Sequence, residues 1–576
     1  MLLQRNPPLD HCIPLNTPHS VIQSLPTWQD NVYRAIGRQT QNDFVEACYP
    51  RFVIHPFVRP LIKMTLEVLR ASPEQTCLLF PSLRLAKAFR SFMYLQFPSA
   101  FSEHAEIHRV SETLNSPPGY EIFAVLFLID QQRMAMKFWT FSGAGISTRL
   151  AENCTSRQNG NLELTLGLPI ELDHEYSDFY NSHTALTSVS EAKAKIQALY
   201  AGLDIDIDSG VSKIRDVEGV QSSDVFLYPT GMSAIWNVHQ MLHDVCKPSG
   251  DTRTFMTAQV NVLYVDSYKF LDTTSPGYHF FTNETLDDLE RLLSGDTNGC
   301  AVLGIFTDFP GNPHLKSADL PRLRKLADKH KVPVIIDETA GCHLNVSVLK
   351  YADIVIGSLT KVFSGFANVL GGALLLNPHS PFYTRFKAHL DITYEDDYFG
   401  ADALVMELNS RGFEERLAKI NSNAEILADW LYVRSKVGGM ENAVIEEVFY
   451  PKYQCRENYE RCMRIVSEST SGDDSQDGKN QDQFTPGYSG IVALSFTSLE
   501  AAKTFYESIQ CYKGTTLGTV VTLLSPFIAI AFPPEKMDWV REHGMSEALV
   551  RFSVGVEDIS RILNSVEAAL FAAERC

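Results

Sequence analysis

The sequence lacks the features that define several classes of protein. No apolar run reaches the ~20 residues that a membrane-spanning helix needs, and residues 1–18 lack the apolar core of a signal peptide. The formal net charge of -19, with no local cluster of Lys and Arg, disfavours binding to nucleic acid or to an anionic membrane surface. The 11 cysteines include no CxxC pair, and their odd number argues against a secreted disulfide scaffold. We therefore expect a cytoplasmic protein with no nucleic-acid and no membrane partner.

Several catalytic signatures are missing as well. There is no GxxxxGK[ST] loop, and Gly143-Ala-Gly145 lacks both a third glycine and a downstream acid on a strand. The 16 histidines include no HExxH and no paired ligand spacing. We predict neither a nucleotide-binding loop nor a metal site.

What is present is an ordinary globular composition, with 45% apolar and 21% charged residues. A chain of 576 residues is too long for one hydrophobic core, so two or three domains are expected. We predict an N-terminal extension at 1–154, a polar linker region at 155–223, a large domain at 224–425 and a small C-terminal domain at 426–576. Residues 467–482, rich in Ser, Asp and Gly, are predicted to form a mobile loop in the last domain.

The first 200 residues predict two strands and two helices. The runs 121–129 and 134–141 are apolar and β-prone, and are separated by a short polar segment that favours a hairpin or adjacent strands. Helices are expected at 147–153 and at 190–200.

From residue 224 onward, short buried strands alternate with amphipathic helices. The strand candidates are 301–306, 334–336, 354–356 and 373–376, which are rich in branched residues. Between the first two, residues 318–330 carry leucines at helical spacing and predict a helix against the sheet. This pattern indicates an α/β domain with a mostly parallel sheet.

Lys361 follows the strand candidate 354–356 within the segment Gly357–Gly365, which contains several hydroxyl residues. The ends of parallel strands are where such sheets place their sites, and a desolvated lysine there suits a carbonyl cofactor. The same pattern also fits a lysine in a surface turn. Asp337 ends the preceding strand candidate at the same sheet edge, where its carboxylate is suited to hold a pyridine nitrogen protonated or simply to cap the next helix.

A phosphate-binding helix start is predicted at Gly231 and Met232. The segment 229–235 introduces a helix, and its first backbone amides have no partner within the helix, so they are available to an anion. The hydroxyls of Ser358 and Thr360 are candidates to add donors to the same phosphate. A glycine at a helix start that only permits a turn would give the same pattern.

Together these residues resemble the cystathionine γ-synthase class of transsulfuration enzymes, and its fungal branch most of all. The resemblance rests on YPTGMSAI at 228–235, IDET at 336–339, SLTK at 358–361 and VRFSVGVED at 550–558. In the extension, SLPTW at 24–28, YPRFVIHP at 49–56 and GAGISTRLAE at 143–152 also resemble fungal members. The resemblance implies the aspartate aminotransferase-like fold type I of pyridoxal 5'-phosphate (PLP) enzymes, with an α+β C-terminal domain, an N-terminal α/β extension, and assembly into a homodimer or homotetramer.

The resemblance also implies roles for individual residues. Lys361 is expected to carry PLP as a Schiff base and to shuttle protons, and Asp337 to bind the ring nitrogen. Tyr264 resembles the tyrosine that stacks on the ring, and Asn312 the asparagine beside the cofactor. Arg551 matches the arginine that grips the substrate α-carboxylate, while Thr516 and Leu517 resemble the segment that lines the substrate site.

The implied reaction is γ-replacement on an O-acyl-L-homoserine such as O-acetylhomoserine, through a vinylglycine-type intermediate. Cysteine as the nucleophile would give cystathionine. Two alternatives remain open at this point: γ-substitution by a carbon or nitrogen nucleophile in fungal secondary metabolism, and a catalytically inactive scaffold with the same fold.

Three departures from the family pattern bear on the first alternative. The Tyr-Ser-Arg motif that a neighbouring subunit lends to the phosphate is not evident, and Lys213 or Arg215 are candidate substitutes. Phe366-Ala367 stands where the fungal pattern has Asp-Ser, which predicts an apolar pocket wall that tolerates a larger nucleophile. The acid-rich segment 394–398 is the third departure, and a solvated face is its simplest interpretation.

Overall fold

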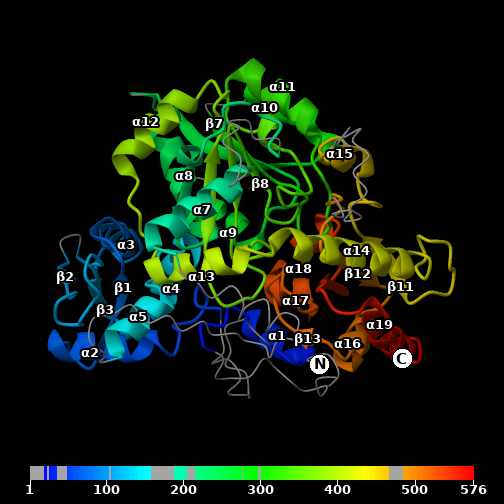
Figure 1. The fold of residues 1–576 in the computed structure, drawn as a ribbon, viewed down its shortest axis with the longest axis horizontal. Helices are drawn as coiled ribbons and strands as arrows, with labels where there is room; N and C mark the ends of the chain where they lie inside the picture. Colours follow the sequence, from blue (N-terminus) through cyan, green and yellow to red (C-terminus); the bar gives the residue numbers. More distant parts are fainter. Residues whose placement is uncertain are drawn as a thin grey trace, which may run out of the picture.

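A computed structural model describes residues 18–22, 25–35, 49–102, 105–156, 187–203, 214–248, 250–274, 277–295, 300–465 and 484–576. In these residues three β-sheets organise the chain, with three, seven and five strands. Figure 1 shows the N-terminal extension on one side of the central sheet and the C-terminal domain on the other. The predicted loop 467–482 and Lys213 lie outside the described residues. The predicted domain boundaries stay predictions.

The central sheet is mostly parallel, which confirms the predicted α/β fold class. Its spatial order is β4 (Val225–Tyr228), β10 (Gly372–Leu376), β9 (Ile354–Gly357), β8 (Val334–Asp337), β7 (Cys300–Asp308), β5 (Thr254–Val260) and β6 (Tyr278–Phe281). The pairs from β9 to β6 are parallel, whereas β10 runs antiparallel to β4 and β9. All four predicted strands are present.

Helices cover both faces of this sheet because successive side chains of each buried strand point to opposite sides. Ile356 and Leu374 pack with α8 (Gly231–Cys246), α9 (Val265–Thr274) and α12 (Tyr383–Thr393). Val355 and Leu375 belong to the opposite cluster, with α7 (Val189–Ala201), α10 (Leu286–Leu293), α11 (Leu320–His330) and α13 (Gly400–Ser410). The helices predicted at 190–200 and 318–330 are confirmed as α7 and α11.

The extension is a small antiparallel sheet packed with helices, but one of its predicted strands is wrong. It contains α2 (Val58–Val68), β1 (Gln75–Phe80), α3 (Leu83–Gln96), β2 (Ile107–Arg109), β3 (Phe123–Leu128), α4 (Gln132–Ser142) and α5 (Thr148–Thr155). The run 134–141 forms α4 instead of a strand, because its buried residues Ala135, Phe138, Trp139 and Ser142 recur at helical spacing. The strand partners of β3 are β1 and β2.

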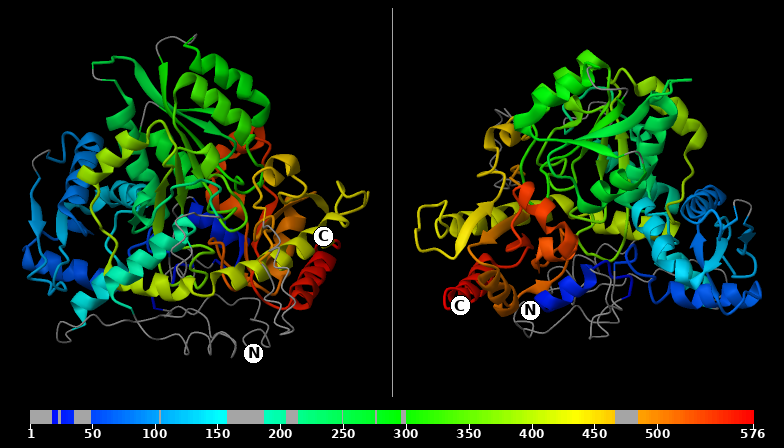
Figure 2. Two further views of the ribbon diagram at one scale, coloured as in Figure 1. Left: turned by 45° about the horizontal axis from the view of Figure 1, so that its top comes forward. Right: turned by 180° about the vertical axis from the view of Figure 1, so that it is seen from behind.

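The C-terminal domain contains the five-stranded sheet, which lies next to α1 (Trp28–Ala35). The strands β11 (Ile445–Phe449), β12 (Ile491–Phe496), β13 (Tyr512–Lys513), β14 (Leu523–Ser525) and β15 (Leu549–Ser553) pack with α14 (Phe413–Tyr432), α16 (Leu499–Ser508) and α19 (Ile559–Ala573). Smaller helices are α15 (Arg456–Glu460), α17 (Phe527–Ala531) and α18 (Met537–Glu542). Helix α1 lies against this domain, as both views in Figure 2 show. The Trp28 ring is edge-on to Tyr506. Among the described residues, no helix combines the length and apolar character that a bilayer crossing requires.

Ion pairs dock the extension and α7 onto the central domain. Arg84 of α3 pairs with Asp397 at 3.0 Å, and Lys193 of α7 pairs with Asp396 at 2.7 Å. Burial raises the pKa of Asp397 to about 6, even though Arg84 opposes the shift. In the acid-rich segment 394–398, Asp396 and Asp397 therefore pair with α7 and α3, while Glu395 and Asp396 are also exposed, in line with the solvated face that the composition suggested.

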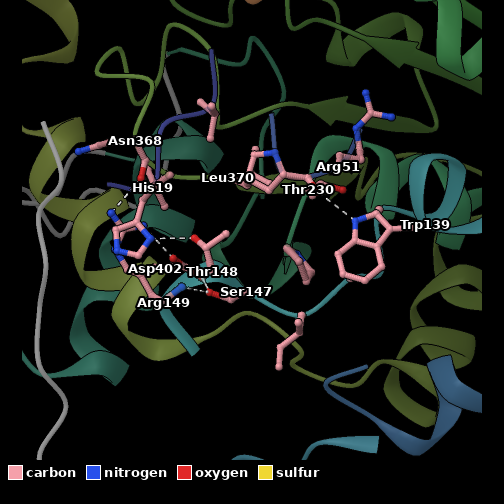
Figure 3. Close-up of a pocket in the computed structure, with 17 residues that line it drawn as sticks. His19, Arg51, Trp139, Ser147, Thr148, Arg149, Thr230, Asn368, Leu370 and Asp402 are labelled. Atoms are coloured by element: carbon pink, nitrogen blue, oxygen red, sulfur yellow. Dashed lines mark hydrogen bonds and ion pairs between the residues drawn. The ribbon is translucent and has the colours of Figure 1, made fainter. Parts of the chain in front are cut away.

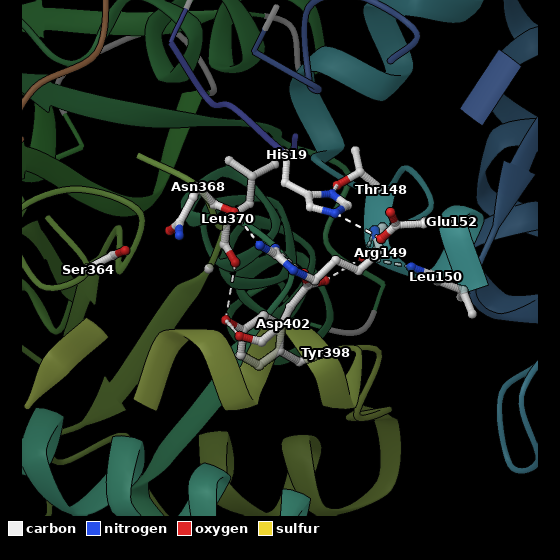
Figure 4. Close-up of polar contacts among 12 residues, drawn as sticks. His19, Thr148, Arg149, Leu150, Glu152, Ser364, Asn368, Leu370, Tyr398 and Asp402 are labelled. Carbon is white, nitrogen blue, oxygen red and sulfur yellow. Dashed lines mark hydrogen bonds and ion pairs between the residues drawn. The ribbon is translucent and has the colours of Figure 1, made fainter. Parts of the chain in front are cut away.

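A buried network joins the N-terminal segment, α5 and α13, as Figure 4 shows. Arg149 donates to the Asp402 carboxylate at 3.0 Å and to the Asn368 carbonyl at 2.8 Å. His19 lies beside it, 2.9 Å from the Thr148 hydroxyl and 3.0 Å from the Glu152 carboxylate. Asn368 follows the segment that contains Lys361, so this network connects the extension to the predicted catalytic loop.

Substituting Arg149 tests how much this docking contributes to stability. Arg149→Met leaves the buried Asp402 carboxylate without its cation, so we expect the free energy of unfolding to fall by about 3–5 kcal/mol. The matched control is Arg109→Met, because Arg109 pairs with Glu121 while its side chain is 61% exposed. Such a pair contributes less than about 1 kcal/mol. Urea unfolding of both variants is the measurement, and equal losses would contradict a docking role for Arg149.

Candidate active site

A single cavity of about 580 Å³ collects most of the predicted site residues. It lies beyond the carboxyl ends of β7 and β8, where α/β sheets place their ligands. Among the predicted residues, those that line it are Gly231, Met232, Tyr264, Asn312, Asp337, Ser358, Lys361, Thr516, Leu517 and Arg551. The extension and the C-terminal domain supply two of its walls, through α4 and through α17 with the strands beside it.

Lys361 is held at the base of this cavity by a short network. Its Nζ donates to the Thr516 hydroxyl at 2.9 Å and lies 3.5 Å from the Tyr49 hydroxyl. Burial lowers the pKa of Lys361, and the positive charges of Arg51 and Arg551 lower it further, against the opposing effect of Tyr49. A lysine with a lowered pKa is neutral, and therefore nucleophilic, in a larger fraction of molecules.

Two carboxylates stand side by side at the ends of adjacent strands. Asp308 of β7 is the register partner of Asp337 of β8. Burial raises the pKa of Asp337 to about 6, and burial together with the Asp337 charge raises the pKa of Asp308 well above its usual range. The Tyr264 amide donates to Asp308 at 2.7 Å, and the Thr339 amide to Asp337 at 2.9 Å. Asp337 is thus a buried carboxylate that a nearby cation would stabilise in its charged form.

The N-terminus of α8 faces the same cavity. The Thr230 side chain caps the helix by accepting from the Ser233 amide at 2.9 Å, and the amides of Gly231 and Met232 have no partner within the helix. Gly231 packs so closely on Ser358 that an added Cβ would lie 3.0 Å from the Ser358 Cβ. The N-terminus of α8 and the Ser358 side chain therefore form one surface of hydrogen-bond donors that faces the cavity.

Thr360 is the one predicted phosphate-binding residue that does not line this cavity, and its role at the phosphate stays a prediction. Its hydroxyl donates to the Gly371 carbonyl at 3.2 Å and accepts from the Gly371 amide at 2.9 Å, and Thr360 does not line the cavity. In the structure this side chain fixes the loop that follows β9 to the start of the β10 region.

Arg551 enters the cavity from β15, at the opposite side from the central sheet. Its Nη2 donates to the Thr515 carbonyl at 2.7 Å and its Nη1 to the Asn312 side chain at 3.4 Å. Its Nε is buried with no partner among the described residues. Burial lowers the pKa of Arg551 to about 10, so the guanidinium is still charged at neutral pH and has an unused donor.

Tyr49 and Arg51 are site residues that the sequence analysis missed. Arg51 donates to the Tyr264 hydroxyl and to the Asp266 carboxylate, both at 2.6 Å, inside the cavity. The signal was present in the sequence, because Tyr49-Pro50-Arg51 has the Tyr-x-Arg spacing of the motif that we described as not evident. Of the substitutes considered, Arg215 is wrong: it is buried in a pair with Glu338 at 2.7 Å and does not line the cavity.

Helix α4 holds this Tyr-Pro-Arg segment in place, and Figure 3 shows Trp139 near Arg51 with the hydrogen bond from its indole nitrogen dashed. The Trp139 indole donates to the Pro50 carbonyl at 3.2 Å, and Arg51 donates to the Thr140 carbonyl at 2.6 Å. The Thr140 hydroxyl returns a bond to the Arg51 carbonyl at 3.2 Å. The helix that sequence analysis mistook for a strand therefore positions two cavity residues.

Phe366 and Ala367 do not form the predicted apolar pocket wall. They are buried in a cluster with Val21 and Tyr49, and neither lines the cavity. The Val21 amide donates to the Ala367 carbonyl at 2.8 Å, which ties the N-terminal segment to the loop after Lys361. These apolar residues support Tyr49 from behind, so they give no information about the nucleophile.

The fold and this cavity define a PLP-dependent enzyme of fold type I. The chain belongs to the family of Cys/Met metabolism PLP-dependent enzymes, whose profile matches residues 211–571. Residues 57–147 match the fungal trans-sulfuration enzyme N-terminal domain. The predicted family, enzyme class and cofactor are thereby confirmed.

Individual relatives cover nearly the whole chain. It is 37% identical to the cystathionine gamma-synthase-like enzyme iboG2 of Amanita muscaria, over 98% of this chain and 97% of the relative. It is 30% identical to a cystathionine gamma-synthase of Neurospora crassa, over 98% of each. A solved cystathionine gamma-lyase from Lactobacillus plantarum is similar to it with a TM-score of 0.49 and 17% identity, over 66% of this chain and 99% of that one.

The residues of the cavity fit PLP. The raised pKa of Asp337 shows a buried carboxylate suited to a ring N–H cation, and the unpartnered amides of Gly231 and Met232 suit a phosphate. Lys361 supplies an amine with a lowered pKa in the same cavity. The Arg551 Nε is a buried donor with no partner among the described residues.

Because Arg51 reaches the cavity of its own chain, we predict that each chain completes its own site. Arg51→Ala removes a buried cation, so cofactor affinity is expected to fall at least about tenfold, while Arg70→Ala, exposed in the same extension, leaves it unchanged. Co-expressing Arg51→Ala chains with Lys361→Ala chains then yields mixed oligomers with no more activity than the Arg51→Ala chains alone. Activity recovered in the mixture would contradict the prediction, because it would show that a neighbouring chain supplies Arg51.

Proposed function

We propose that the protein catalyses PLP-dependent γ-replacement on an O-acyl-L-homoserine. The observation that supports this most directly is the cavity that joins Lys361, with its lowered pKa, to Asp337 and to the spare donor of Arg551. When bound, PLP supplies an electron sink that stabilises negative charge at the substrate Cα. Side chains of the protein itself bind the cofactor, orient the substrate and transfer the protons.

In this proposal the cofactor is held at three points. Asp337 binds the ring nitrogen, and the amides of Gly231 and Met232 with the Ser358 hydroxyl bind the phosphate. Tyr264 stacks on the ring. Arg51 and Tyr49 close the site above Lys361, and the bond from Arg51 to the Tyr264 hydroxyl fixes the orientation of that ring.

Arg551 binds the substrate α-carboxylate. Its two bonds to Thr515 and Asn312 hold the guanidinium in place, and the free Nε adds a donor that points to no protein acceptor among the described residues. Thr516 and Leu517 line the cavity beside it. This arrangement orients the Cα–H bond of a bound amino acid toward Lys361.

Lys361 then moves the protons. Its Nζ, neutral in the fraction that the lowered pKa provides, takes a proton from Cα, gives that proton up within the cavity and then takes one from Cβ, after which the γ-acyloxy group leaves as a carboxylate. The Thr516 hydroxyl, 2.9 Å away, keeps Nζ over the reacting carbons. Once a nucleophile has added at Cγ, one proton each is returned to Cβ and to Cα. Cysteine would give cystathionine, and a carbon or nitrogen nucleophile in fungal secondary metabolism is the alternative.

The setting proposed for this activity is the cytoplasm, with the protein as a homodimer or homotetramer. The only substrates required are small molecules, an amino acid and its nucleophile.

Lys361→Ala tests the function. We expect it to abolish the visible absorption band of the bound cofactor and to slow release of acetate from O-acetyl-L-homoserine by at least about a thousandfold, because both proton transfers depend on this amine. The matched control is Lys325→Ala, an exposed lysine of α11, which is expected to keep the band and the rate. A wild-type protein that binds PLP yet releases no acyl group would favour the inactive scaffold.

A further inference from the structure

The cavity has an outer wall that the proposed reaction does not use. One face of α4 contributes Arg133, Met136, Lys137, Thr140 and Phe141, residues that recur at helical spacing. The cavity is also lined by Phe527, Ile530 and Ala531 of α17. Arg133 and Lys137 are exposed whereas Lys361 and Asp337 are only partly exposed, so this wall forms the mouth of the cavity.

The mouth carries positive charge without matching negative charge. Neither Arg133 nor Lys137 has a carboxylate partner among the described residues, in a chain whose net charge is -19. Lys269 lies in the same cavity and donates to the Ala531 carbonyl at 2.8 Å, and burial lowers its pKa. The nearby carboxylate, Asp266, is already paired with Arg51 at 2.6 Å.

In the described part of the chain, unpaired cations at the mouth and the absence of an unpaired carboxylate beside them favour anionic ligands over cationic ones. A carboxylate at the mouth would meet two free cations, whereas an ammonium group would meet no unpaired carboxylate among the described lining residues outside the Asp308 and Asp337 pair. Met136, Phe527 and Ile530 provide apolar surface for the body of the ligand between the mouth and the reacting centre. Arg551 is too deeply buried to serve the mouth and is assigned to the α-carboxylate.

We propose that Arg133 and Lys137 form a second carboxylate subsite, so that the enzyme prefers a reactant that carries an anionic group at the end remote from its reacting atom. This inference rests on the proposed γ-replacement and specifies its substrate class. Two reactants qualify: an acyl group with a distal carboxylate, or a nucleophile with net negative charge in place of zwitterionic cysteine. The recognition chemistry is the same for both, and the test separates them.

The test compares the wild-type holoenzyme with Arg133→Gln/Lys137→Gln. Both side chains are exposed, so the substitutions remove charge without disturbing the core. The matched control is Lys63→Gln/Arg70→Gln, which removes two exposed charges from the same extension away from the cavity. The wild-type and control proteins should give the same values in each measurement.

Binding is measured first, with probes that cannot react. Titration calorimetry compares 3-(methylthio)propionate with 2-(methylthio)ethanol, which differ in charge but have a similar apolar body. We expect wild-type protein to prefer the anion by about tenfold and the double variant to lose most of that preference. Equal affinities in wild type, or an unchanged preference in the variant, would overturn the proposal.

Kinetics then identifies the reactant. One arm compares acyl release from O-succinyl- and O-acetyl-L-homoserine, and the other compares 3-mercaptopropionate and 2-mercaptoethanol as nucleophiles. If the wild type prefers the anionic compound in one arm and the double variant does not, the subsite is supported. The arm in which this happens shows whether the subsite binds the acyl group or the nucleophile. Preferences that the variant leaves unchanged in both arms would overturn it. If wild type releases no acyl group at all, the proposed function fails instead, and the calorimetric result still decides whether the subsite exists.

Discussion

The structure depends on keeping one amine and one carboxylate out of water in the same cavity. Burial is the main cause that lowers the pKa of Lys361 and raises that of Asp337 to about 6, so the charged form of each group is destabilised. A cofactor with an aldehyde and a basic ring nitrogen relieves both costs. The seven-stranded sheet is what makes this pairing possible, because parallel strands bring Asp337 and the loop after β9 to a common edge.

The N-terminal extension contributes residues directly to this cavity. Tyr49 and Arg51 close the cavity, α4 holds them through Trp139 and Thr140, and the network around Arg149 ties the extension to the loop that follows Lys361. The cluster of Val21, Phe366 and Ala367 supports Tyr49 from behind. The surroundings of Lys361 are therefore built by three segments that are far apart in the sequence.

Helices and strands could be predicted from the sequence wherever their local hydrophobic pattern fits only one type of secondary structure. The strands around Asp337 and Lys361 are short and apolar, and α11 has leucines at helical spacing, so each was predictable without tertiary information.

The run 134–141 was not predictable in this way, because short apolar stretches fit both strand and helix, and only packing on α8 and α9 decides between them. For Thr360 the sequence could not show that its hydroxyl bonds to the backbone of Gly371, because that contact depends on how the loop after β9 folds. The Tyr-x-Arg pair was missed because it lies more than 300 residues before Lys361 in the chain, as the separation of 312 between Tyr49 and Lys361 shows.

The central claim is that PLP is bound covalently to Lys361. Borohydride reduction of the holoenzyme, followed by proteolysis and mass mapping, tests it most directly because reduction fixes the cofactor to the amine that carries it. The account predicts one phosphopyridoxyl-modified peptide containing Lys361. Label on another lysine, or an unmodified Lys361 peptide from protein that retains the cofactor, would contradict it.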